Sequence, residues 1–177
     1  MPTTLMGANP APNFLPRAAA PSGNLQKCVL MIDDSTDAMV LVRLDLRDFG
    51  RGRYRLEWAN CLTDGLSQIL KGRVDVVLLD LGLPESSGPS TSASVHEAAA
   101  EVPILVLTGD EREETASTIL SSGFVEDYLV KGQISGTMLV QAIRAALASR
   151  KKRTELRGSG HENGMEEIIG QPKARDE

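Results

Sequence analysis

The chain has 177 residues, 41% of them hydrophobic and 24% charged, so it can bury a core without disulfide or metal support. Its net charge of -5 argues against a general nucleic-acid binder, which would present a basic surface. Cys28 and Cys61 stand far apart and outside any CxxC pattern, which argues against a disulfide framework or a thiolate metal site.

The chain divides by composition into three predicted parts. Residues 1–24 are rich in Pro, Ala, Gly and Asn, which predicts a disordered arm, and they lack the apolar run of a signal peptide. Residues 25–150 predict one folded domain, and residues 151–177 predict a helix extension with a flexible tail. Because no stretch approaches about 20 consecutive apolar residues, we expect a cytoplasmic protein that does not contact a membrane.

Short aliphatic runs alternate with helical patterns from Lys27 onward. Three of these runs are apolar on both faces, which is typical of central strands in a parallel sheet that helices cover on both sides. Two weaker runs read as further strands, one of which alternates like an edge strand. The predicted strands are Cys28–Ile32, Tyr54–Trp58, Val74–Leu79, Ile104–Leu107 and Asp127–Val130.

Helical spacing fills the intervals between these strands. The segment from Ser86 to Ala100 is the exception, because Pro89 and a Ser/Thr cluster weaken its first turn, and we expect only a short, late-starting helix there. Five βα units favour a parallel sheet with right-handed crossovers. The other predicted helices are Ser35–Phe49, with Asp34 or Ser35 as N-cap and Phe49 on the buried face, Leu62–Leu70, Glu111–Ser122 and Ser135–Arg153.

Polar residues follow the predicted strands at their carboxyl ends. Asp33 and Asp34 follow the first strand, Asp80 the third, Thr108 the fourth and Lys131 the fifth. In an open sheet of strand order 2-1-3-4-5, ligands bind where the order reverses, between strands one and three. The three aspartates would then surround one crevice, and clustered carboxylates of this kind suit Mg²⁺.

This ordered set resembles the response-regulator receiver family, to which the bacterial chemotaxis regulator belongs. The segment Asp80–Gly88 follows the family pattern D-x-x-[LM]-P-x-x-x-G, and Tyr128 stands three residues before Lys131, where the family keeps a switch aromatic. The resemblance spans about residues 26–150. It implies a flavodoxin-like (CheY-like) α/β fold, a three-layer sandwich whose five parallel strands have the order 2-1-3-4-5.

The resemblance also implies the roles of the site residues. Asp80 would be the phosphoacceptor, and Lys131 would pair with it and with the phosphoryl group. Mg²⁺ would contact Asp34 directly and Asp33 through water. The backbone carbonyl of Gly82 would complete the protein ligands of the metal, together with the Asp80 carboxylate.

The resemblance further implies a switch and its partners. Thr108 would hydrogen-bond the phosphoryl group and move toward it, drawing Tyr128 inward. The phosphoryl donor would be a sensor histidine kinase or a histidine phosphotransfer protein, and the output an unidentified protein target. We therefore expect a stand-alone receiver of a two-component phosphorelay, which signals by protein–protein contact and is not an enzyme.

Two alternatives to the switching receiver stay open. Gly132 follows Lys131, where the family usually has a cis proline, so a trans peptide or a reshaped loop could stand there. A pseudo-receiver that docks without switching is therefore one alternative. The other is a Mg²⁺-dependent phosphatase of the haloacid-dehalogenase type, which Gly82 disfavours because that family has a general-acid aspartate two residues after its nucleophile.

Overall fold

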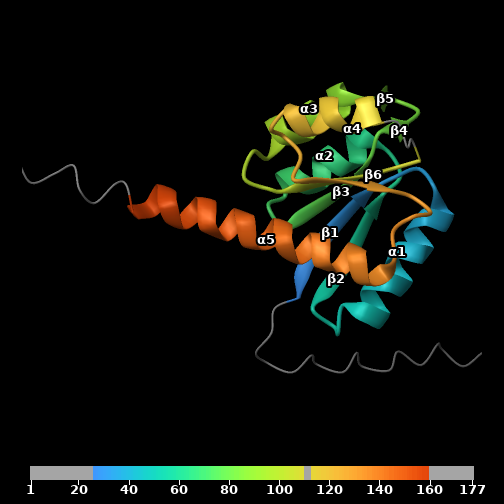
Figure 1. The fold of residues 1–177 in the computed structure, drawn as a ribbon, viewed down its shortest axis with the longest axis horizontal. Coiled ribbons are helices and arrows are strands. Elements are labelled where there is room, and N and C mark those ends of the chain that lie inside the picture. The colour runs from blue at the N-terminus through green and yellow to red at the C-terminus, as the bar shows by residue number, and fades with distance from the viewer. Residues whose placement is uncertain (1–25, 110–112, 160–177) are drawn as a thin grey trace, which may run out of the picture.

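Residues 26–109 and 113–159 are described in a computed structural model, in which strands and helices alternate along the chain (Figure 1). The elements in chain order are β1 Lys27–Ile32, α1 Thr36–Phe49, β2 Tyr54–Ala59, α2 Leu62–Leu70, β3 Val76–Asp80, β4 Gly82–Leu83, β5 Ser86–Ser87, α3 Pro89–Ala98, β6 Ile104–Thr108, α4 Glu113–Ser121, β7 Asp127–Val130 and α5 Gly136–Ser159.

Five of the strands form one parallel sheet in the order β2-β1-β3-β6-β7. Counted in chain order, this is the predicted order 2-1-3-4-5. Helices α1 and α5 cover one face, and α2, α3 and α4 cover the other (Figure 1). The predicted flavodoxin-like three-layer sandwich is therefore confirmed. The two-residue strands β4 and β5, which sequence analysis did not predict, form a small antiparallel hairpin directly after β3.

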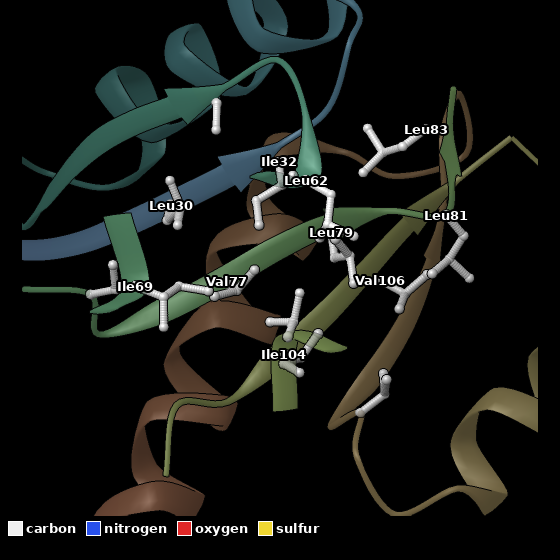
Figure 2. Close-up of a cluster of buried hydrophobic side chains, with 14 of the residues drawn as sticks. Leu30, Ile32, Leu62, Ile69, Val77, Leu79, Leu81, Leu83, Ile104 and Val106 are labelled. Carbon is white, nitrogen blue, oxygen red and sulfur yellow. The ribbon is translucent and has the colours of Figure 1, made fainter. Parts of the chain in front are cut away.

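Successive residues of β1 point to opposite faces of the sheet, so the strand contributes to two separate cores. Leu30 and Ile32 pack in the cluster beneath α2, α3 and α4, which Figure 2 shows, whereas Val29 and Met31 pack against α1 and α5. All four side chains are completely buried. Burial on both faces explains why the run is continuously apolar rather than alternating.

Helix α3 begins at Pro89, so the prediction of a late-starting helix was wrong. Proline is well tolerated at the first helical position, where its missing N–H would have had no helical partner. The Ser/Thr cluster is accommodated by local hydrogen bonds: the Ser92 hydroxyl donates to the Pro89 carbonyl at 2.8 Å, and the Ser86 and Thr91 hydroxyls lie 2.7 Å apart. The helix ends at Ala98, before the Ala99-Ala100 pair.

Phe49 does not lie on the buried face of α1. Met39, Val42 and Leu46 are buried as predicted, but Phe49 is 49% exposed. It lies at the last turn of α1, where its ring approaches the start of α5 so closely that a Cβ on Gly136 would sit 2.4 Å from Phe49 Cδ2.

Helix α5 runs past the predicted end at Arg153 and extends away from the body of the domain (Figure 1). Two arginines attach its middle to the body. Arg150 donates to the Asp75 carbonyl at 3.3 Å, and Arg153 forms an ion pair with Glu126. The predicted arm 1–24 and tail residues 160–177 lie outside the described residues. Within the described ranges, no helix is long and apolar enough to cross a membrane.

Replacing Gly65 by valine is expected to lower the free energy of unfolding by about 1–3 kcal/mol, because an added Cβ would lie 2.5 Å from Ile32 Cδ1 beneath α2. The matched control is Ser67→Val, which places the same β-branched side chain on the exposed face of the same helix, where it does not overpack the core. Urea unfolding measures both variants. Equal losses would show that α2 can shift to accept the side chain.

Candidate functional site

The carboxyl ends of β1 and β3 bring three aspartates together. Ile32 pairs with Leu79 in the parallel ladder, so Asp33 and Asp80, each the next residue, lie side by side. One carboxylate oxygen from each of Asp33, Asp34 and Asp80 falls within 4.8 Å of the others. Asp33 and Asp80 are buried and Asp34 is exposed, so the cluster opens to solvent on the Asp34 side.

Lys131 neutralises part of this cluster. Its Nζ lies 2.7 Å from Asp33 Oδ2 and 2.7 Å from Asp80 Oδ2. Burial alone would lower the pKa of Lys131, but the two carboxylates outweigh burial and raise it above its usual value. Lys131 is therefore a cation at neutral pH, and three carboxylates share one ammonium group.

Asp33 is held by one hydrogen bond to its side chain and one to its backbone carbonyl. The Ser35 N–H donates to Asp33 Oδ1 at 2.9 Å, and Trp58 Nε1 donates to the Asp33 carbonyl at 2.7 Å. Burial raises the pKa of Asp33, and the charge of Asp80 raises it further. Lys131 and the Ser35 N–H lower it, but not enough to cancel the effect of burial. Among the described residues, Asp33 Oδ2 has the ion pair with Lys131 but no hydrogen bond of regular angle.

Asp80 is fixed through both of its carboxylate oxygens. The Gly82 N–H donates to Oδ1 at 3.0 Å, and Lys131 Nζ donates to Oδ2 at 2.7 Å. Its side chain keeps 11% exposure, so it is partly accessible to solvent. At the position where a haloacid-dehalogenase-type phosphatase would carry its general acid, the chain therefore supplies only a backbone hydrogen bond.

Thr108 and Tyr128 lie on the neighbouring strands β6 and β7. Thr108 is buried at the end of β6, and its carbonyl accepts from the Lys131 N–H at 2.7 Å, which ties the lysine to the edge of the sheet. Tyr128 pairs with Val106 in the β6–β7 ladder. It is half-buried and packs against the cluster beneath α2, α3 and α4.

The loop after Lys131 is shaped by Gly132. The peptide bond before Gly132 is trans, and Gly132 has φ +86°. Proline is locked near φ −65°, so it could not replace Gly132 in this conformation. The chain therefore reaches the Lys131–Asp80 contact through a loop different from the one that the family's usual proline would give.

The role of Trp58 was not predicted from the sequence, where this residue appeared only as the end of a predicted strand. A usable signal was present, since Trp58 stands near the end of the strand predicted to flank the first. In the β1–β2 ladder Trp58 pairs with Met31, which places its indole beside the residues that follow β1. Trp58 thereby positions the backbone from which the Asp33 side chain projects.

The chain is an α/β domain with an acidic site at the carboxyl edge of its sheet, and the comparisons identify its family. The model of the response regulator receiver domain matches residues 29–144. The chain belongs to this family, whose members are receiver domains of two-component systems. It is 35% identical over 103 residues to the transcriptional regulatory protein DltR of Streptococcus agalactiae, covering 58% of this chain and 44% of that protein.

Another relative matches over more of the chain, and two solved structures share its fold. The transcriptional regulatory protein ZraR of Salmonella typhimurium is 28% identical over 124 residues, covering 70% of this chain and 27% of ZraR. The chain thus spans less than half the length of these curated relatives. A CheY-like receiver domain from Methanospirillum hungatei has a TM-score of 0.64 at 22% identity, covering 73% of this chain and 99% of that chain. The signal receiver domain of a putative Luxo repressor protein from Vibrio parahaemolyticus has a TM-score of 0.66 at 22% identity, covering 76% of this chain and 99% of that chain.

The donor set fits the Mg²⁺ that receiver domains generally bind at an acidic pocket. Mg²⁺ takes oxygen ligands and usually binds through one or two carboxylates while it keeps several waters. The cluster offers three carboxylates, one of them on a solvent-exposed residue. Asp33 Oδ2, buried without a regular hydrogen bond, is an atom whose negative charge a cation would stabilise further.

Proposed function

We propose that this receiver accepts a phosphoryl group on Asp80 from a sensor histidine kinase or a histidine phosphotransfer protein, and signals by contact with a downstream protein. The observation that carries the proposal is the contact of Lys131 Nζ with both Asp33 and Asp80, at 2.7 Å each, on the carboxyl edge of the sheet. Ligands of open α/β sheets bind at this edge.

The residues around Asp80 prepare its carboxylate for attack. The Gly82 N–H and the Lys131 ammonium each hold one oxygen, which limits the rotation of the group. In the transfer, a carboxylate oxygen forms a new P–O bond while the bond from phosphorus to the donor histidine nitrogen breaks. Lys131 then lies close to the phosphoryl oxygens, where its positive charge stabilises the charge that they carry.

Mg²⁺ would be held by Asp33, Asp34, Asp80 and the Gly82 carbonyl, Asp34 contacting it directly and Asp33 through water. When bound, the ion neutralises the acidic cluster and the negative charge of the incoming phosphoryl group. Without it, two of the three negative charges are left unbalanced by Lys131 and oppose the approach of the phosphoryl group. We therefore propose that phosphorylation depends on Mg²⁺.

The proposed output begins at Thr108. Its position at the end of β6, next to β7, supports a movement of the Thr108 hydroxyl toward the phosphoryl group that lets the half-buried Tyr128 ring turn further inward. The face formed by α4, β7 and α5 would change shape as a result. A bistable element biased by new charge-assisted bonds is a common form of such switches.

A second candidate function is a docking module that binds partners without switching. Two observations favour it: Gly132 gives the loop after Lys131 a backbone that proline cannot adopt, and Tyr128 already packs partly against the core. In such a module the face of α4, β7 and α5 would have the same shape whether or not Asp80 carries a phosphoryl group.

Beryllofluoride, which stands in for the phosphoryl group on a carboxylate, separates the two functions. On addition of beryllofluoride with Mg²⁺ to the ¹⁵N-labelled chain, we expect NMR shift changes that spread from Asp80 through Thr108 to Tyr128 and α4, because the switch links these strands. Asp80→Asn is the matched control and should show none of them. Changes confined to the residues around Asp80 would contradict switching and favour the docking module.

Several finer features of the proposal stay predictions. They are the stand-alone action of the receiver, its cytoplasmic location, the identity of the kinase, the absence of enzymatic activity and the absence of direct nucleic-acid contact. The division into an arm 1–24, a receiver 25–150 and an extension 151–177 is likewise a prediction.

A further inference from the structure

A polar cavity lies on the side of the domain where α1 ends, away from the acidic cluster. It has a volume of about 470 Å³ and opens between the end of α1, the turn that leads into β2 and the first half of α5. Three arginines, Arg51, Arg53 and Arg144, line it together with Tyr54 and Gln141. This volume is within the usual range for small-molecule sites.

The three guanidinium groups have no ion pair within the described ranges. Asp48, the carboxylate that also lines the cavity, is bound by Arg47 on α1 through both of its oxygens. Arg53 and Arg144 both lie close enough to Tyr54 to act on the pKa of its hydroxyl, and both oppose the rise that burial causes. The arginines from the turn and from α5 therefore line the same cavity.

The backbone of the turn adds an independent observation. Arg51 has φ +51° and is the one residue other than glycine with positive φ in the described part of the chain. The left-handed conformation costs free energy for any residue with a Cβ, and glycine or asparagine is the usual choice. Gly52, the next residue, also has positive φ, at +69°. The turn thus holds an arginine beside the cavity in a conformation that arginine disfavours.

The net charge of the protein opposes the binding of anions. With a net charge of -5, the molecule as a whole repels anions, so an anion held here must be held by local geometry. Arginine presents a planar fork of donors that matches phosphate oxygens in pairs. Three guanidinium groups offer more hydrogen-bond donors than a single carboxylate can accept. They suit a ligand with several charged oxygens.

We propose that this cavity binds the diphosphate group of a small molecule through Arg51, Arg53 and Arg144. The site is separate from the acidic cluster and needs neither Mg²⁺ nor phosphorylation of Asp80. This proposal is therefore independent of the proposed function. The diphosphate could come from free pyrophosphate or from a nucleotide, which would add contacts from its ring and sugar.

Calorimetric titration of the full chain in EDTA with pyrophosphate, and separately with ADP, tests the proposal. We expect saturable one-to-one binding of at least one of them. Tighter binding of ADP would identify a nucleotide, and equal binding would identify the diphosphate group itself as the ligand. Failure of both to saturate would overturn the proposal.

Arginine variants locate the binding. Each of Arg51→Gln, Arg53→Gln and Arg144→Gln should weaken binding about tenfold or more, since each removes charge-assisted hydrogen bonds. Arg43→Gln is the matched control, because Arg43 is exposed on α1 but does not line the cavity. It should bind as the wild type does. Equal weakening in all four variants would reveal only a general effect of net charge and would contradict the site.

Discussion

Replacing Asp80 by asparagine is expected to abolish the acid-labile phosphorylation that acetyl phosphate and Mg²⁺ produce on the full chain. The amide is a poor nucleophile and cannot ligate Mg²⁺ as a carboxylate does. Asp80 also lies beside Lys131 and its side chain is partly exposed, unlike Asp33, which is fully buried. Intact-mass measurement should find one added phosphoryl group on the wild type and none on Asp80→Asn.

The control for this loss is Asp64→Asn, which removes an exposed carboxylate on α2, away from the cluster. It should be labelled as the wild type is. Circular dichroism should show that Asp80→Asn is folded, because the substitution leaves the Lys131–Asp33 ion pair in place. Labelling that persists in Asp80→Asn would place the phosphoacceptor elsewhere.

Mg²⁺ is expected to raise the melting temperature of the wild-type chain, because three clustered carboxylates share one ammonium group and a bound cation relieves their repulsion. At a concentration ten times its dissociation constant, a ligand of the native state adds about 1.4 kcal/mol to the free energy of unfolding. For a domain of this size that corresponds to a rise of about 3–6 °C. Differential scanning fluorimetry with and without millimolar Mg²⁺ measures it.

Asp34→Ala should remove most of this gain, since Asp34 is the exposed carboxylate through which the metal would enter the cluster. Without Mg²⁺, the same variant should melt no lower than the wild type, because it removes one of the repelling charges. Asp64→Ala is the control and should keep the full Mg²⁺ response. If Asp34→Ala responds as strongly as the wild type, the metal binds at another place.

The central strands β1, β3 and β6 were predictable because both of their faces are buried, which makes nearly every residue in them apolar. The run at β1 is continuously apolar because Leu30 and Ile32 face one core and Val29 and Met31 the other. Strand β7, Asp127–Val130, has the predicted limits even though its pattern is weaker. The strand ends follow from the runs, so the proximity of the three aspartates could also be predicted.

Features that depend on loops and helix ends were harder to predict. The weakness assigned to Pro89 overlooked that the first turn of a helix needs no N–H from that residue. The predicted burial of Phe49 followed helical spacing, but the last turn of α1 lies against the start of α5 rather than in the core. The resemblance implied that Lys131 pairs with Asp80, and its second contact, with Asp33, depends on a loop that sequence spacing does not determine.

The length of α5 determines how far the end of this helix lies from the core and in which direction it points. Leu147 is the last residue of the helix that packs in the core beneath α1 and α5, and the helix continues to Ser159. The twelve residues after Leu147, at 1.5 Å each, extend the helix by about 18 Å. Because each residue also turns the helix by about 100°, the end of α5 keeps a fixed orientation relative to the acidic cluster. Inserting one residue into the exposed part would move that end outward by only about 1.5 Å, yet would turn it to a different side of the molecule.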